Sequence, residues 1–174
     1  MTVFPATIAD VPVIQHIASI TWPVAYAEIL SPGQLSYMLE KMYNQATLQQ
    51  QITEEGHQYF LVSTEGKTVG FAGISPVSYL NIPGNYKQVF KLHKLYVLPT
   101  VHKTGAGKKL MESIFKFIRS QKGDYLVLNV NRKNAAVDYY VRKGFEIIEE
   151  GDFDIGSGFF MNDYIMGKPV ESER

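Results

Sequence analysis

The sequence predicts an α/β fold in which helices flank a mixed, mostly antiparallel sheet. Two observations support this prediction. Residues 58–98 contain runs rich in aromatic and β-branched side chains, separated by turn sequences, as expected of paired strands. Residues 88–148 then alternate strand, helix, strand, helix and strand, an order that implies parallel pairing in this half of the sheet. All 174 residues are expected to form a single domain, 1–174, with one core.

Three helices are predicted in the first half of the chain. Thr7 or Asp10 is expected to cap the first helix, and Pro23 is expected to stop or redirect it. Pro32 suits the first turn of the second helix, because the N–H group that proline lacks would have no partner there. A third, shorter helix is predicted over residues 46–54.

The strands are predicted from short apolar runs bounded by turn residues. They cover residues 3–4, 58–64, 68–76, 88–98, 125–130, 145–148 and 164–166. Glu65-Gly66 is a turn sequence between the second and third of these strands, which are therefore expected to form a hairpin. Residues 151–163 are rich in glycine and aromatic residues and are expected to be irregular.

Two helices are predicted in the second half of the chain. Residues 105–121 carry apolar side chains at helical spacing and are predicted to form an amphipathic helix that ends at Gly123. Asn134 is expected to cap a further helix that reaches Lys143, with Gly144 in the left-handed position that follows its last turn.

Composition excludes several classes of protein. The chain carries 17 basic and 17 acidic residues, and this balance argues against a general nucleic-acid binder. It has no cysteine, which excludes disulfides, thiolate metal sites and a cysteine nucleophile. Its four histidines lie far apart in the sequence, so no metal site is predicted. No apolar run reaches about 18 residues and the N-terminus lacks a secretory signal, so we expect a cytoplasmic protein without a membrane partner.

The most informative motif is the loop at residues 102–108, which joins a predicted strand to the helix that follows. A helix N-terminus presents unpaired N–H groups and a positive dipole end, and Gly105 and Gly107 would let a ligand approach the backbone. A phosphorylated ligand is therefore expected here. A Walker A loop would need glycine in place of His102, and a dinucleotide fingerprint would need glycine in place of Leu110, so neither motif applies.

Two motifs in this order and spacing closely resemble the GCN5-related N-acetyltransferase (GNAT) superfamily. The loop His102-Lys103-Thr104-Gly105-Ala106-Gly107 fits the family's acetyl-CoA loop, Arg/Gln-x-x-Gly-x-Gly/Ala, with His102 in place of arginine or glutamine. The segment Asn134 through Phe145 matches the family's later Asn-x-x-Ala-x-x-x-Tyr-type helix and the Gly-Phe that follows it. The resemblance covers residues 58–149 and extends loosely over the N-terminal helices. It implies a sheet that splays between its fourth and fifth strands.

The resemblance implies acetyl-CoA as the cosubstrate and no metal. The pantetheine arm would pair with the end of the strand at 88–98, as an added strand does, and the pyrophosphate would lie on the glycine loop. The cofactor-binding residues implied in this way are Leu95, Tyr96, Val97, His102, Lys103, Thr104, Gly105, Ala106, Gly107, Lys108, Asn134 and Tyr140.

The resemblance also implies direct attack of an amine on the thioester, without an acyl-enzyme. A backbone N–H near Val97 would hold the oxyanion. Tyr140 would be the acid that protonates the leaving thiolate, whose reference pKa is about 8.5. The usual position of the family's glutamate base is occupied here by His93 or Lys91. His93, with a reference pKa of about 6.5, is the candidate base, and a water chain is the alternative.

The acceptor site is implied to be built from the N-terminal helices and the 151–163 segment, with Trp22 and Tyr26 as candidate substrate-binding residues. The Trp22 and Tyr26 region and Asn162-Asp163-Tyr164 resemble PaiA-like polyamine acetyltransferases. We therefore expect a small-molecule amine or polyamine acceptor. The alternatives are a protein N-terminus or lysine, and a CoA-binding sensor without turnover. No nucleic-acid partner is expected, and a homodimer is left open.

Overall fold

The computed structural model describes residues 1–79 and 81–172, which form two compact units. Of the described residues, unit 1 contains 1–75 and 93–116, and unit 2 contains 76–79, 81–92 and 117–172. The chain passes between the units along two strands, β3 (Lys67–Val77) and β4 (Val89–Val97), and along one helix, α4 (Ala106–Ser120).

The strands form a seven-stranded sheet in the order β1-β2-β3-β4-β5-β7-β6. Besides β4, they are β1 (Thr2–Pro5), β2 (Gln58–Thr64), β3 (Lys67–Val77), β5 (Tyr125–Asn131), β6 (Glu146–Gly156) and β7 (Phe159–Pro169). Strands β4 and β5 are parallel, whereas β1 and β2, β2 and β3, β5 and β7, and β6 and β7 pair antiparallel. The mixed sheet predicted from the order of elements is therefore confirmed.

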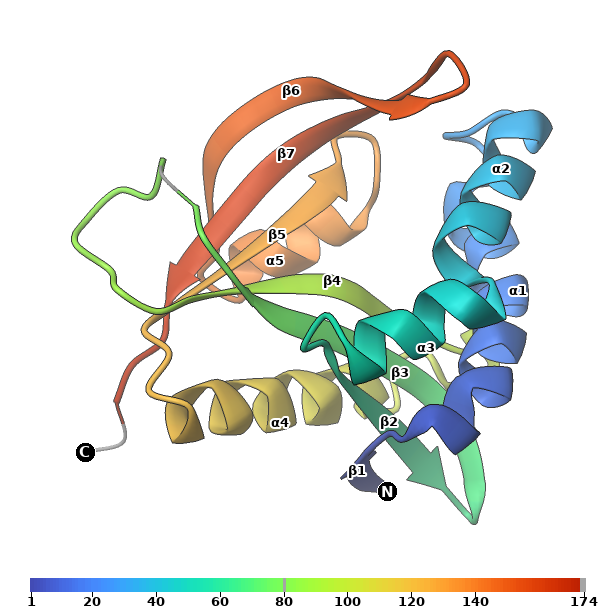
Figure 1. The fold of residues 1–174 in the computed structure, drawn as a ribbon, viewed down its shortest axis with the longest axis horizontal. Helices are drawn as coiled ribbons and strands as arrows, with labels where there is room; N and C mark the ends of the chain where they lie inside the picture. Colours follow the sequence, from blue (N-terminus) through green and yellow to red (C-terminus); the bar gives the residue numbers. More distant parts are fainter. Residues whose placement is uncertain (80, 173–174) are drawn as a thin grey trace. The chain divides into compact units, whose positions relative to one another are not determined.

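The helices of unit 1 lie beside one another (Figure 1), and α1, α2 and α3 contact each other in pairs. Their bounds are η1 (Ile8–Asp10), α1 (Val11–Tyr26), α2 (Pro32–Tyr43), α3 (Gln45–Thr53) and η2 (Pro99–Val101). The first of these begins with a capping box, in which the Thr7 side chain accepts from Ala9 N while the Asp10 carboxylate accepts from Thr7 N. Among the described residues, no helix has the length and apolar character needed to span a membrane.

Pro23 does not end the first helix, so that part of the prediction is wrong. It lies inside α1, where a proline costs about 3 kcal/mol because it removes a backbone hydrogen bond. Trp22 and Tyr26, on either side of it, are 2% and 7% exposed, and their ring centroids lie 4.6 Å apart. Burial of two large aromatic rings offsets a cost of that size, and it requires the helix to continue through Pro23.

The segment 151–163 is not irregular, which corrects a second prediction. Strands β6 and β7 form one long hairpin (Figure 1), and Gly156 pairs with Phe159 across a two-residue turn. Ser157 and Gly158 in this turn have φ angles of 53° and 76°, the left-handed values that such a turn requires. The register shifts between Ile147 and Glu149 and again between Asp154 and Gly156. These irregularities interrupt the alternation by which a strand is recognised in sequence.

Strands β4 and β5 pair over only part of their length. The register joins Val89–Leu92 to Tyr125–Leu128, all within unit 2, while β4 continues to Val97. The predicted splay concerns the second half of β4, which this pairing does not include. On unit 2, Val89, Tyr125 and Val127 form a small buried cluster.

Candidate active site

The glycine loop leads directly into α4, as predicted. The backbone N–H of Lys109 donates to Gly105 O at 2.9 Å, so the hydrogen bonding of the helix starts at Gly105. By the geometry of a helix, the N–H groups of the preceding residues, up to Lys108, have no acceptor within it. They form a cluster of donors at the positive end of the helix dipole, which suits a phosphate group.

His102 links this loop to the end of β4. Its Nε2 lies 3.0 Å from Val97 O, and because a carbonyl can only accept, Nε2 carries the proton and donates. Thr104 Oγ1 also donates to a carbonyl, that of Val101, at 2.7 Å. His102 occupies the motif position where the GNAT superfamily usually has arginine or glutamine. The structure gives its side chain a definite contact, which fixes the loop against the strand.

The two glycines of the loop differ in what the fold demands of them. Gly105 has a φ of +92°, a conformation in which any other residue would be strained. Gly107 has no such φ, and a Cβ added there would meet only Val97 Cγ2, at 4.0 Å. Glycine inside a helix is about 1 kcal/mol less favourable than alanine. The fold of unit 1 therefore gives no reason for glycine at 107.

The end of β4 lies against β3 within unit 1. A Cβ added to Gly70 would come within 2.9 Å of Tyr96 O, so the backbones approach closely. The Tyr96 hydroxyl lies 3.0 Å from that of Tyr26. The Trp22 indole donates to the Tyr43 hydroxyl at 2.9 Å. Trp22 and Tyr26 thus belong to the buried core of unit 1, and their contact with an acceptor stays a prediction.

His93 contacts polar groups of two other segments in unit 1. Its Nε2 is 2.7 Å from Ser75 Oγ of β3, and its ring stacks on His57 with centroids 4.6 Å apart. The His57 ring in turn stacks on Tyr59 at 6.4 Å. The pKa of His57 is lowered by burial and, to a smaller extent, by the charge of Lys94, while Glu55 opposes the shift. The sequence analysis had no means of pairing His57 with His93.

Lys94, next to His93 on β4, is a buried cation. It is 4% exposed, and its Nζ donates to Tyr59 Oη at 2.6 Å, to Gln51 Oε1 at 3.2 Å and to Met42 O at 3.4 Å. The Nζ also lies 4.7 Å from the centre of the Tyr43 ring. Burial lowers its pKa to about 7, and the charge of Glu55 opposes this shift to a smaller extent. Lys94 therefore titrates near neutrality, unlike an ordinary lysine.

Unit 2 contains the predicted residues of the later helix. This helix, α5 (Ala136–Arg142), starts two residues after Asn134, whose Oδ1 accepts from Ala136 N at 2.9 Å. Asn134 therefore precedes the cap position, which is Ala135, and this corrects the predicted boundary. Tyr140 is 9% exposed and packs edge-on against Phe145, with ring centroids 5.4 Å apart. Gly144 has a φ of +86°, as predicted for the residue after the helix.

Unit 2 contains a buried carboxylate, that of Asp163, which is 5% exposed. Asn129 Nδ2 donates to its Oδ2 at 3.4 Å, and its Oδ1 is buried without a hydrogen-bond partner. Burial raises the pKa of Asp163, while Lys91 and Arg132 oppose the shift. The pKa of Lys91 is lowered by burial, against the attraction of Asp163. Burial therefore outweighs the attraction of Asp163 in its effect on Lys91.

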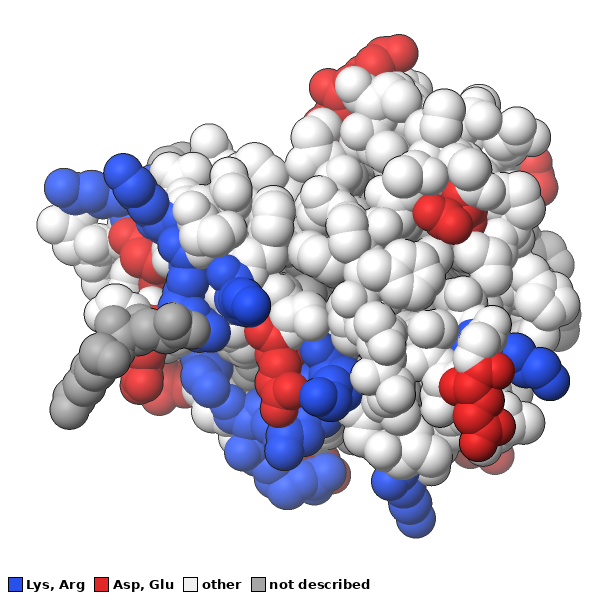
Figure 2. Space-filling view, turned by 90° about the horizontal axis from the view of Figure 1, so that it is seen from below, with Lys and Arg blue, Asp and Glu red and all other residues white. Residues whose placement is uncertain are grey.

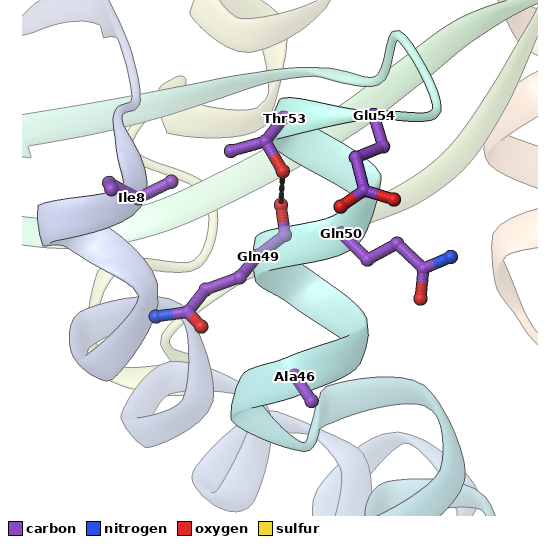
Figure 3. Close-up of a pocket in the computed structure, with 6 residues that line it drawn as sticks. All are labelled: Ile8, Ala46, Gln49, Gln50, Thr53 and Glu54. Carbon is purple, nitrogen blue, oxygen red and sulfur yellow. Dashed lines mark hydrogen bonds between the residues drawn. The ribbon is translucent and has the colours of Figure 1, made fainter.

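The remaining features of the structure offer few groups that could react or bind a ligand. An open pocket of about 520 Å³ lies between η1 and α3 (Figure 3), with its lining supplied by Ile8, Ala46, Gln49, Gln50, Thr53 and Glu54. Thr53 Oγ1 donates to Gln49 O inside it, and Glu54 is its one ionisable group. No group of three or more potential metal ligands occurs in residues 1–79 and 81–172. Figure 2 shows acidic side chains among the Lys and Arg side chains of the face in view, unlike an extended basic surface for nucleic acid.

Comparisons with known proteins point in one direction. A family model described as an acetyltransferase (GNAT) domain matches residues 26–160. An uncharacterized N-acetyltransferase of Mycobacterium tuberculosis is 28% identical over 151 residues, which cover 86% of this chain and 91% of the relative. YjgM, an uncharacterized N-acetyltransferase of Escherichia coli, is 33% identical over 104 residues, 59% of each chain.

Solved structures show the same fold. The PaiA N-acetyltransferase of Thermoplasma acidophilum, in complex with coenzyme A, has a TM-score of 0.77 at 20% identity and covers 97% of this chain and 99% of its own. A ribosomal-protein-alanine N-acetyltransferase of Brucella melitensis has a TM-score of 0.64 at 19% identity and covers 98% and 100%.

Proposed function

This chain belongs to the GNAT acetyltransferase family, and on that basis we propose that it transfers the acetyl group of acetyl-CoA directly to the primary amine of a small molecule. Acetyl-CoA would lie at the loop of unit 1, where donors at the start of α4 are accessible without any bulky side chain at 105 or 107. The pantetheine arm would lie along Leu95, Tyr96 and Val97. Lys103 and Lys108 would add positive charge near the phosphates.

Gly107 is the observation that carries this proposal. The fold leaves room for a Cβ at this position, and helix propensity favours alanine there. A glycine that the protein itself does not need is explained by a ligand that passes close to its Cα. Gly105 provides the contrast, since its φ of +92° already explains why it is glycine.

We expect Gly107→Ala to stabilise the free protein by about 0.5–1 kcal/mol, since alanine loses less backbone freedom in a helix than glycine does. The same substitution should weaken acetyl-CoA binding at least about tenfold, or about 1.4 kcal/mol, because the methyl group displaces the pyrophosphate. Gly107→Glu should weaken binding further by adding a charge of the same sign as phosphate. Urea unfolding measures the first effect, and calorimetric titration with acetyl-CoA measures the second.

Gly33→Ala is the matched control, because Gly33 is also the second residue of a helix, α2. Its acetyl-CoA affinity should equal that of the parent protein. Should Gly107→Glu fold and bind acetyl-CoA with unchanged affinity, the loop would not be the phosphate site.

The proposed reaction has no covalent enzyme intermediate. The lone pair of the acceptor amine forms a bond to the thioester carbon, and the carbon–sulfur bond then breaks. The oxyanion formed in between would be held by a backbone N–H near Val97. The sulfur leaves as a thiolate and takes a proton from the Tyr140 hydroxyl, while the amine nitrogen loses a proton to a base.

We propose His93 as that base. Its contact with Ser75 Oγ at 2.7 Å supports a defined tautomer. If Nε2–H donates to the serine, the basic lone pair is on Nδ1, and the amine proton is taken up there. Kcat/KM should then rise with pH to a plateau, and His93→Gln should remove this rise.

A small cationic amine, such as a polyamine, is the proposed acceptor. The exposed side chains Glu150, Asp152 and Asp154 on β6 would attract such a cation. Arg132 neutralises one of them, with Nη2 at 2.7 Å from Asp152 Oδ1. Arg132 therefore offsets one of the three negative charges, and the other two would attract a cation.

We expect spermidine to be acetylated faster than peptides of neutral composition, and its KM to rise with salt as the attraction is screened. Release of CoA across a panel of amines and peptides measures both effects. Faster turnover of peptide N-termini would mean that the acceptor is a protein and not a small amine. Binding of acetyl-CoA without release across the whole panel would indicate a sensor.

A further inference from the structure

The candidate base His93 shares its surroundings with a second histidine. The rings of His57 and His93 stack with centroids 4.6 Å apart and an angle of 24° between their planes. In this face-to-face arrangement no ring nitrogen points at the other ring, so a proton cannot pass directly between them. Two imidazolium charges at this distance would repel strongly. The pair therefore accepts one proton far more readily than two.

Lys94 places a third ionisable group beside this pair. Its Nζ is fixed by three acceptors, Tyr59 Oη, Gln51 Oε1 and Met42 O, and lies 4.7 Å from the centre of the Tyr43 ring. The ring of Tyr59, whose hydroxyl accepts from Nζ, also stacks on His57. Tyr59 thus contacts both the Lys94 ammonium and the His57 ring. The ammonium is buried, so its charge is poorly screened by solvent.

Two neutral groups contact the pair, Ser75 of β3 on His93 and Tyr59 of β2 on His57. Tyr43 of α2 and Gln51 of α3, which contact Lys94, are also neutral in the pH range of histidine titration. Glu55 carries a charge, but its carboxylate is 3.7 Å from His57 Nε2 with a side chain that is 46% exposed, so solvent weakens its effect. The charge of Lys94, by contrast, acts on His57 from a buried position.

We propose that Lys94 is a positioning residue that acts through the histidine pair: its fixed ammonium repels a proton from His57 and His93 and so keeps His93 in its base form. This inference rests on the proposed role of His93. It has a cost, because a base that holds a proton less tightly is also a weaker base. The gain is that a larger share of His93 is unprotonated, and so able to accept the amine proton, than in the same site without the charge of Lys94.

NMR titration of the full chain tests the electrostatic step without any need for activity. We expect Lys94→Met to raise the titration midpoints of His57 and His93 by about half a pH unit or more, since the repelling charge is lost. His16 and His102 are exposed and serve as internal references whose curves should not move. Lys67→Met removes an exposed lysine of the same unit and is the matched control. Unchanged midpoints for His57 and His93 in Lys94→Met would overturn the proposal.

The kinetic profile separates this proposal from the role of His93. In Lys94→Met, the acid limb of kcat/KM should move to higher pH with the His93 midpoint, while the plateau at high pH is retained. A loss of activity at every pH without movement of the limb would mean a merely structural role and would overturn the proposal. Moved NMR midpoints with an unmoved limb would instead overturn His93 as the base.

If Lys94→Met does not fold, the parent protein decides the question. The protonation of Lys94 can then be followed through its own Cε signal. At the pH where Lys94 titrates, the curves of His57 and His93 should show a second inflection, because coupled groups report each other's protonation. The absence of that inflection would overturn the proposal.

Discussion

Replacing Tyr140 by phenylalanine is expected to lower kcat by about 10²–10⁴, which corresponds to roughly 3–5 kcal/mol of barrier. The substitution keeps the ring that packs against Phe145 and removes only the hydroxyl proposed to protonate the departing thiolate. The loss arises in the transition state, so the affinity for acetyl-CoA and the thermal stability should change little. Initial rates, calorimetric titration and thermal unfolding measure the three quantities.

Tyr139→Phe is the matched control for this experiment. Tyr139 precedes Tyr140 on α5, its hydroxyl is buried without a hydrogen-bond partner, and burial raises its pKa. Removing an unsatisfied hydroxyl should leave kcat unchanged and stabilise the protein slightly. If Tyr140→Phe instead retains more than about a third of kcat, well inside the loss expected for an acid, Tyr140 is a packing residue.

Local sequence signals were sufficient for most elements of the fold. Glu65 and Gly66, with φ of 50° and 75°, form the predicted turn between β2 and β3. The exceptions are places where packing between distant residues overrides a local rule. Pro23 stays helical because the rings beside it are buried. The hairpin of β6 and β7 went unrecognised because its shifts of register break the two-residue alternation.

The candidate site likewise has one part that was predictable from local sequence and another that depends on tertiary structure. The loop around Gly105 was predictable because its proposed function depends on a local feature, a run of consecutive backbone groups at a helix start. The surroundings of His93 were not predictable, since His57 is 36 positions away in the sequence and meets it only through the pairing of strands. No role was predicted for Lys94, because a lysine in a strand is usually exposed. Only tertiary structure shows that it is buried against Tyr59.

The buried ammonium of Lys94 should make the stability of the protein depend on pH in a predictable direction. Its pKa is about 7 in the folded protein, whereas an unfolded chain has the ordinary lysine value of about 10.4. Between these values the unfolded state binds more protons, so the free energy of unfolding rises with pH. The slope is about 1.4 kcal/mol per pH unit, or about 3 kcal/mol between pH 7 and 9.5. Below about pH 7 both states are protonated and the contribution is constant.

Lys94→Met should remove this dependence, so the variant should gain stability relative to the parent protein as the pH falls from 9.5 to 7. Urea unfolding at several pH values measures the difference, with Lys67→Met as the control whose curve should run parallel to the parent. The range ends below about pH 10, where Tyr43 and Tyr59, whose pKa is raised by burial, begin to act in the opposite direction. Parallel curves for Lys94→Met and the parent would mean that the three acceptors and two rings around Nζ compensate fully for burial. Lys94 would then remain an ordinary cation throughout this pH range.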